Sequence, residues 1–172
     1  MCANAIQKHL KSADFKGTWD KVISKWHTIT VHYIGRLDEK TVFDTSIEEI
    51  AKDCGLYASG RDYSQGLSFT VWAGQMIAGF DNAVVGMKLS QTKTITIPPQ
   101  EAYGDRSESK LVKVPLEQIP WSDQLKKGMQ VYASNGQAFT VYAIDDKNVT
   151  IDTNPELAGK TLIFDITVTS IQ

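Results

Sequence analysis

The sequence contains little cysteine and little histidine, and this scarcity excludes several kinds of site. Its two cysteines, Cys2 and Cys54, belong to no CxxC pattern. The three histidines show no metal-ligand spacing and have no carboxylate cluster beside them, so we expect no metal site. A GxSxG motif, a P-loop and a dinucleotide fingerprint are also missing. We therefore expect no cofactor and no covalent catalysis.

Strong charge of one sign and long hydrophobic runs are also absent. The formal net charge is −2, from 18 basic and 20 acidic residues, so the chain lacks the excess of positive charge that is typical of nucleic-acid-binding proteins. No apolar run approaches the roughly 20 residues of a transmembrane helix. The hydrophobic content of 42% is ordinary for a globular protein. We expect a monomer without a membrane-spanning segment.

The two cysteines bear on the cellular compartment. We expect both to be reduced, as in a cytoplasmic protein, and a single disulfide between them is the alternative. The start Met-Cys-Ala allows a second hypothesis, in which Cys2 anchors an exported lipoprotein whose signal peptide is absent here. No hydrophobic signal region precedes Cys2 in this sequence. The cytoplasm is therefore the expected location, and the anchored lipoprotein is the alternative.

Apolar residues at helical spacing predict a helical N-terminal extension over residues 1–26. A first short helix follows Asn4, which can cap it, with apolar positions Ile6, Leu10 and Ala13. A second helical stripe follows Thr18 and comprises Trp19, Val22, Ile23 and Trp26. We expect the second helix to pack its tryptophans on the main domain.

Alternation of polar and apolar residues predicts the strands of a main domain. They are expected at 27–37, 41–44, 69–72, 93–97 and 161–171. Ser46 and Glu49 have the spacing of a capping box, which predicts a helix at 47–53 that ends before Gly55. A second short helix is predicted before Gly86, with an apolar face formed by Met76, Ile77, Phe80, Ala83, Val84 and Met87.

The character of the sequence changes after Gly104. A polar linker, 105–110, is followed by three predicted strands at 130–133, 138–144 and 149–152. Asn135-Gly136 joins the first two, and this dipeptide is a strong hairpin signal. The long strand at 161–171 is expected to pair back into the main domain. We therefore predict a discontinuous main domain, 27–106 and 158–172, interrupted by a small β-rich domain at 107–157.

Five sequence motifs occur in an order that identifies a known family. They are HYIG (32–35), VFDTS (42–46), GQMIAGFDNAVVGM (74–87), IPPQEAYG (97–104) and LIFDITV (162–168). Together they resemble the FKBP family of peptidyl-prolyl cis-trans isomerases. The resemblance implies an α+β fold, in which an antiparallel β half-barrel wraps a short helix. It also implies an enzyme that accelerates X-Pro isomerisation in unfolded or partly folded polypeptides, and a pocket that could bind macrolide inhibitors.

The inserted domain carries its own resemblance. Its segments LVKVPLEQIP and LKKGMQV look like the insert-in-flap (IF) chaperone domain of the SlyD-like branch. The helix at 47–53 and the RDY loop (61–63) look closer to archaeal, short-type members. No histidine-rich tail follows Gln172, so a nickel-binding role is not implied.

Carried over by position, the family's pocket residues form two sets. The catalytic set is Tyr33, Asp44, Tyr103 and Phe164. The substrate-binding set is Phe43, Leu67, Met76, Ile77 and Phe80. Two departures stand out, because Phe80 occupies a position where many members have tryptophan, and Trp72 replaces a usual glycine. A peptide-binding module that has kept the fold but lost most catalysis is therefore the alternative function.

The insertion has more apolar residues than a small domain easily buries. We expect a surface for unfolded client segments on some of Leu111, Val112, Val114, Leu116, Ile119, Tyr132, Phe139 and Tyr142. The alternative is that all of them fill a small core.

Overall fold

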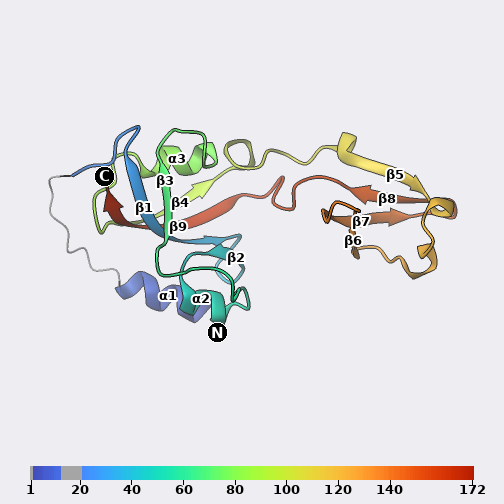
Figure 1. Cartoon of the computed structure of the whole chain (residues 1–172), viewed down its shortest axis with the longest axis horizontal. Helices are drawn as coiled ribbons and strands as arrows, with labels where there is room; N and C mark the ends of the chain where they lie inside the picture. The colour runs from blue at the N-terminus through green and yellow to red at the C-terminus, as the bar shows by residue number, and fades with distance from the viewer. Residues whose placement is uncertain (1, 13–20) are drawn as a thin grey trace. The chain divides into compact units, whose positions relative to one another are not determined.

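The chain forms two compact units that are described separately. The computed structural model describes residues 2–12 and 21–172 (Figure 1). Unit 1 comprises Met1–Gly104 and Lys160–Gln172, and unit 2 comprises Asp105–Gly159. Unit 2 is therefore an insertion, since the chain leaves unit 1 once and returns to it once. Within the described residues, no helix has both the length and the hydrophobicity needed to cross a lipid bilayer.

Unit 1 is built on a five-stranded antiparallel sheet. Its strands are β1 (Thr28–Arg36), β2 (Val42–Thr45), β3 (Leu67–Thr70), β4 (Thr92–Ile97) and β9 (Leu162–Ile171). The order is β2-β1-β9-β4, and β3 also pairs with β1. Leu162, Phe164, Ile166 and Val168 of β9 are buried at alternate positions, as its sequence predicts, and Asp165 is buried as well. The expected α+β class is confirmed, and the last strand does return to the main sheet.

The short helix α3 (Ala78–Val84) packs closely against this sheet. A Cβ on Gly79 would lie 2.4 Å from Cγ2 of Ile97, so only glycine lets the helix approach β4 this closely. Phe80 is fully buried beneath the helix. The helix is shorter than predicted, because Met76 and Ile77 precede it in loop conformation.

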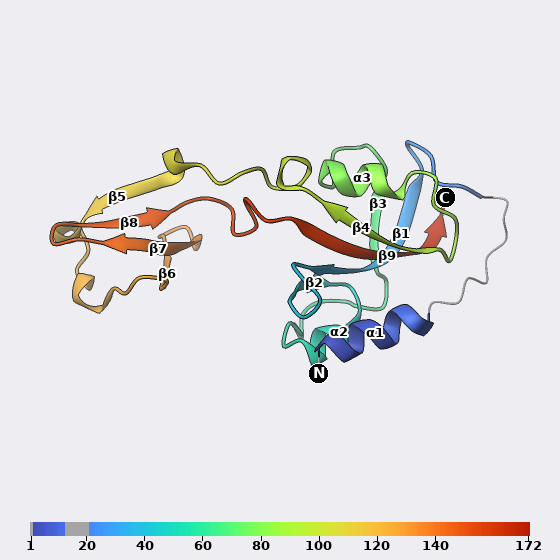
Figure 2. The ribbon, with the colours of Figure 1, turned by 180° about the vertical axis from the view of Figure 1, so that it is seen from behind.

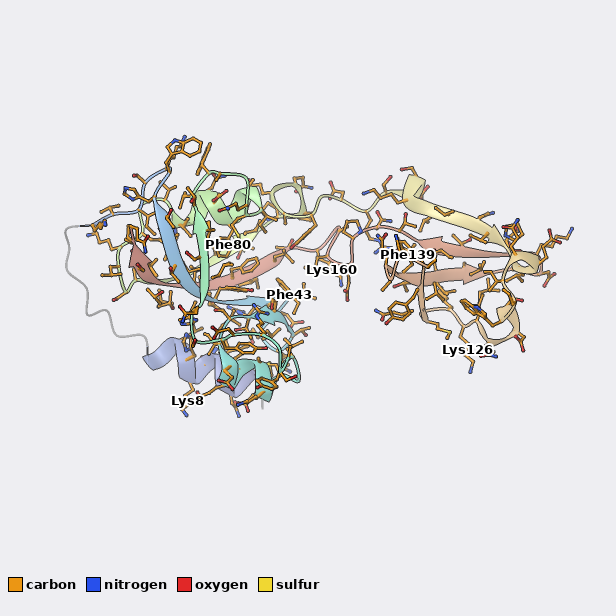
Figure 3. All side chains as sticks on the ribbon, in the orientation of Figure 1. Lys8, Phe43, Phe80, Lys126, Phe139 and Lys160 are labelled. Atoms are coloured by element: carbon orange, nitrogen blue, oxygen red, sulfur yellow. A yellow bond between two sulfur atoms is a disulfide. The ribbon has the colours of Figure 1, made fainter. Side chains whose placement is uncertain are left out.

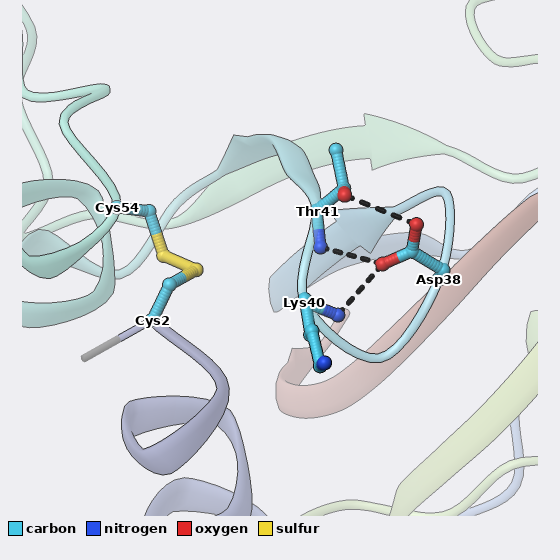
Figure 4. The surroundings of a disulfide bond; sticks show 5 residues. All are labelled: Cys2, Asp38, Lys40, Thr41 and Cys54. Carbon is cyan, nitrogen blue, oxygen red and sulfur yellow. Dashed lines mark hydrogen bonds between the residues drawn. A yellow bond between two sulfur atoms is a disulfide. The ribbon is translucent and has the colours of Figure 1, made fainter.

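The N-terminal helix α1 (Cys2–Ser12) packs beside α2 (Glu48–Asp53). Ile6 joins Ile34, Val42 and Ile50 in a buried cluster. A disulfide links Cys2 to Cys54 across 52 positions of sequence, next to the turn held by Asp38 (Figure 4). The expectation of reduced cysteines was wrong. Sequence spacing could not reveal the bond, because it depends on how α1 docks onto the sheet. The predicted position Ala13 lies outside the described residues.

Two predictions about helices, one ending at Trp26 and one capped by Ser46, were also wrong. The helix expected to end at Trp26 is absent from the described part, 21–27. Instead, Val22 forms a bridge with Lys88, and the backbone N–H of Ile23 donates to the carbonyl of Met87 at 2.8 Å. Trp19 lies outside the described residues. Ser46 does not cap α2, because its hydroxyl accepts a hydrogen bond from the backbone N–H of Tyr33 at 2.8 Å.

Unit 2 contains a four-stranded antiparallel sheet. Its order is β5-β8-β7-β6, formed by Leu111–Pro115, Asn148–Asp152, Ala138–Ile144 and Gln130–Tyr132. The three predicted strands are confirmed, and β5 is an additional edge strand whose proline lies at its last position. Short 3-10 turns occupy Glu108–Lys110, Leu116–Gln118 and Ser122–Gln124 in unit 2, and a further one occupies Pro99–Glu101 in unit 1. Figure 2 shows both units from behind.

Candidate active site

The expected pocket residues converge in unit 1. All nine line one pocket of about 360 Å³, and Gln75 joins them. Phe43 approaches from β2, and Phe80 approaches from α3 (Figure 3). The segment before α3 contributes Met76 and Ile77, and this explains why helical spacing alone misplaced them. Six strands or segments from different parts of the chain thus meet at one concave site.

The floor of the pocket is a cluster of aromatic rings. The ring centroids of Phe80 and Phe164 are 5.1 Å apart, at an interplanar angle of 89°. Phe43 meets Phe164 edge-on at 5.6 Å, and Tyr33 meets Phe80 edge-on at 6.3 Å. Edge-to-face packing of this kind is favourable because the positive ring edge faces the negative ring face. The pocket therefore has rigid, apolar walls.

Gly35 on β1 makes room for this cluster. A Cβ at this position would lie 2.7 Å from Cζ of Phe43 and 3.0 Å from Cε1 of Phe164. Such contacts are far closer than van der Waals distance, so any other residue would push both rings away. The HYIG motif thus has a steric reason for its final glycine.

One rim of the pocket is polar and tightly linked. The hydroxyl of Tyr33 donates to Oδ2 of Asp44 at 2.5 Å, while Nη1 of Arg61 donates to Oδ1 of Asp44 at 2.6 Å. Nη2 of Arg61 also donates to the Tyr33 oxygen at 2.9 Å. Burial and the Asp44 carboxylate raise the pKa of Tyr33 to about 12, so the hydroxyl stays protonated at neutral pH.

Arg61 was missed as a site residue by sequence reasoning. Its side chain reaches Asp44 from a loop 17 positions later in the chain, and no periodic pattern predicts such a contact. Its guanidinium pKa is raised, chiefly by the hydrogen bond to Asp44. The RDY sequence (61–63) was the available signal, through its likeness to the archaeal members.

Tyr103 lines the pocket from a turn that follows β4. A turn at Pro99–Glu101 is closed by the Gly104 N–H, which donates to the Pro99 carbonyl at 2.7 Å. Gly104 has a φ of 77°, a left-handed conformation that favours glycine. Tyr103 is 47% exposed, so its hydroxyl is accessible to a bound peptide. Among residues 2–12 and 21–172, no group of three or more metal-ligating side chains is placed to hold an ion.

Comparison with known proteins agrees with this geometry. The sequence profile of FKBP-type peptidyl-prolyl cis-trans isomerases matches residues 20–169. This chain belongs to that family. It is 41% identical over 152 residues to the short-type peptidyl-prolyl cis-trans isomerase of Methanocaldococcus jannaschii, covering 88% of this chain and 95% of the relative.

Bacterial relatives are more distant. The FKBP-type isomerase SlyD of Treponema pallidum is 29% identical over 123 residues, covering 70% of each chain. SlyD of Helicobacter pylori is 35% identical over 102 residues, covering 57% of this chain and 55% of the relative. The chain is thus an FKBP-type peptidyl-prolyl isomerase, and its substrates are proline-containing polypeptides.

The isomerase accommodates its two departures from the family pattern differently. Phe80 is fully buried and packs against three aromatic neighbours, so it is an intact floor for the pocket. Trp72 has a φ of 68°, which explains why glycine is usual at this position. Its backbone N–H donates to Oδ1 of the buried Asp81 at 3.1 Å, which helps to hold the turn.

In unit 2 of the isomerase, the expected client-binding residues divide into two groups. Four pack against the core of Leu125, Val131, Val141 and Val149 and are only partly exposed: Val114, Leu116, Ile119 and Phe139. Val112, Tyr132 and Tyr142 are exposed, and Leu111 is partly so. Sequence reasoning missed three further exposed apolar residues, Trp121, Met129 and Ile144.

Proposed function

We propose that the aromatic pocket of unit 1 binds and isomerises the X-Pro bond, and that unit 2 holds unfolded segments of the same client. The observation that carries the first part is the convergence of all nine expected residues on one pocket of about 360 Å³. The second part is supported by the exposed apolar side chains of unit 2 and by its resemblance to an IF domain.

Catalysis would rest on the dryness of the pocket. Rotation about the X-Pro bond is slow because the C–N bond has partial double-bond character, with a barrier of about 18–20 kcal/mol. Twisting the bond removes resonance and reduces the charge on the carbonyl oxygen. A site walled by Phe43, Phe80 and Phe164 favours this less polar, twisted amide over the planar one. The reaction needs no general acid and no covalent intermediate.

The polar groups would have separate roles. Tyr103 lies at the exposed rim, where its hydroxyl can donate to a carbonyl oxygen of the bound peptide. Both carboxylate oxygens of Asp44 accept hydrogen bonds, from Tyr33 and Arg61. We assign Asp44 the role of a positioning residue that fixes the Tyr33 ring.

A protease-coupled assay on short X-Pro peptides tests the site. We expect Tyr103→Phe and Asp44→Ala each to lower kcat/KM, and the double variant to lower it further. Tyr132→Phe is the matched control, because this exposed tyrosine lies in unit 2. Full activity of the double variant would discredit the site. Peptide binding without turnover in the unmodified protein would instead favour the alternative, a peptide-binding module that has lost most catalysis.

Deletion of residues 107–157 tests the role of unit 2. The pocket residues all lie outside the deleted segment, so activity on short peptides should persist. Acceleration of proline-limited refolding of a protein substrate should be lost. The triple variant Val112→Ser, Tyr132→Ser and Tyr142→Ser should give the same result without removing the fold of unit 2. Unchanged refolding activity in both variants would contradict the proposed role of unit 2.

The remaining proposals concern partners and compartment. We propose that the isomerase acts as a monomer and that macrolide inhibitors compete for its aromatic pocket. The Cys2–Cys54 disulfide favours an oxidising compartment over the cytoplasm, because cytoplasmic reductants keep most thiols reduced. Cell fractionation with detection of the oxidised protein tests this location.

A further inference from the structure

Three segments of unit 1 meet at an edge that takes no part in the pocket. The N–H of Trp26 donates to the carbonyl of Val71 at 3.0 Å, and the N–H of Ile23 donates to that of Met87 at 2.8 Å. Segments 21–27, 71–74 and 84–88 therefore lie side by side. We call them the tryptophan edge. None of these residues lines the pocket.

The tryptophan edge exposes an unusual amount of apolar surface. Trp26 is 70% exposed and Trp72 is 43% exposed. Val22 and Val85 are also exposed on the same three segments. Large exposed side chains grouped in this way are typical of interaction surfaces, whereas isolated ones need no explanation.

Backbone strain accompanies this exposure. Trp26 has a φ of 71° and Trp72 a φ of 68°, so both are left-handed, which is costly for any residue other than glycine. Among the described residues, one other non-glycine residue has a positive φ, and this residue, Ser90, is small and polar. Glycine would relieve the strain at both positions, so the chain keeps each indole ring at a cost to its backbone conformation. Such strain often accompanies a functional surface.

The charge of the tryptophan edge is positive. Its three segments contain Lys21, Lys25 and Lys88 but neither aspartate nor glutamate, although the whole chain has a net charge of −2. Nζ of Lys25 lies 3.7 Å above the ring centroid of Trp72, a cation–π contact that keeps an ammonium group beside the ring. Nζ of Lys21 donates to the carbonyl of Ile171 at 2.7 Å, which also holds this lysine at the edge.

We propose that the tryptophan edge docks the isomerase on an anionic lipid surface. Indole rings favour the headgroup level of a bilayer because they combine an apolar body with a polar N–H. Each lysine near an anionic surface strengthens binding about fivefold. Both tryptophans lie in turns and are exposed, and a bilayer accepts such groups without a complementary groove. An acidic peptide would need a groove or matched donors, so the lipid surface fits these side chains better.

Co-sedimentation of the full chain with vesicles tests the proposal. We expect binding to vesicles of equal phosphatidylglycerol and phosphatidylcholine, weakening as salt is raised, and little binding to phosphatidylcholine alone. The double variant Trp26→Gly and Trp72→Gly should bind at least tenfold more weakly while remaining folded, because glycine tolerates both backbone conformations. Lys25→Gln should weaken binding about fivefold. Trp121→Ala, which removes a 41% exposed tryptophan from unit 2, should bind like the unmodified chain.

Several outcomes would overturn the proposal. These are no binding of the unmodified chain to anionic vesicles, equal binding to both kinds of vesicle, and equal binding by the double glycine variant. Binding of a polyglutamate peptide without binding of vesicles would assign the tryptophan edge to an acidic protein partner instead. The peptide isomerase assay and circular dichroism serve as controls for folding, because the edge lies outside the pocket.

Discussion

The hydroxyl of Tyr33 lies 2.5 Å from Oδ2 of Asp44, and both groups are bonded to the same arginine, Arg61. The three side chains come from β1, β2 and the loop after α2. Their mutual bonds fix the Tyr33 ring, whose edge contributes to the aromatic wall of the pocket. The loop that carries Arg61 thereby helps to position a ring of the pocket.

Arg61→Ala should lower kcat/KM on short peptides a few-fold. The guanidinium group of Arg61 holds Asp44 and Tyr33 together. The Arg61–Asp44 ion pair is partly exposed, so its stabilisation of this arrangement is on the order of 1 kcal/mol. Arg61→Lys keeps the charge and loses the fork, and it should recover only part of the activity. Steady-state kinetics of both variants provide the measurement. Unchanged kinetics in Arg61→Ala would show that Tyr33 is positioned without it.

Gly35→Ala should damage both stability and activity. The added methyl would collide with Phe43 and Phe164, and overpacking of this kind costs about 1–3 kcal/mol. Urea unfolding measures the free energy, and the peptide assay measures the pocket. Gly60→Ala is the matched control, because no atom lies within 4 Å of the position of its Cβ. A Gly35→Ala protein as stable and active as the control would contradict the packing described for the rings.

Reduction of the disulfide should lower stability by about 2–4 kcal/mol, because the bond restricts a long loop of the unfolded chain. Thermal unfolding with and without reductant measures the effect. The double variant Cys2→Ser and Cys54→Ser should match the reduced protein and should not respond to reductant. Turnover of short peptides at 25 °C should survive, since no residue of α1 lines the pocket. Equal stability of the two redox forms would contradict this prediction.

Stability should fall as the pH is lowered from about 7.5 to 5.5, in part through His9. Burial and the neighbouring His32 lower the pKa of His9 below its usual 6.5. The unfolded chain then binds a proton more readily than the folded one, so acidification favours unfolding. Asp165 and Glu49 oppose this shift without reversing it. Urea unfolding at both pH values should show a smaller loss in His9→Gln, and an equal loss would exclude this residue as a source.

The sequence predicted those elements that depend on local pattern. Alternation of polar and apolar residues located the strands of unit 1. The dipeptide Asn135-Gly136 located the hairpin between β6 and β7. The stripe ending at Trp26 failed because apolar spacing of three and four is also compatible with an irregular segment. In the fold, the backbone of Ile23 pairs with Met87, and this distant contact overrides helical propensity.

The composition of the site was predictable only through family resemblance. Motif order identified the nine pocket residues, whereas composition alone could not separate Phe80 from an ordinary core residue. The role of Arg61 escaped prediction, and the Cys2–Cys54 bond was given only as the alternative, for a common reason. Both contacts join segments that are distant in the sequence, and neither leaves a periodic signal in it.

The position of β9 has a consequence for how the enzyme matures on the ribosome. This strand lies between β1 and β4, yet the whole of Asp105–Gly159 is translated before it. Until unit 2 has been translated, the nascent chain lacks both the strand that joins β1 to β4 and the pocket residue Phe164. The sheet of unit 2 needs β8, which ends at Asp152, and β9 begins soon afterwards at Leu162. The isomerase pocket can therefore form only after the whole insertion has been synthesised.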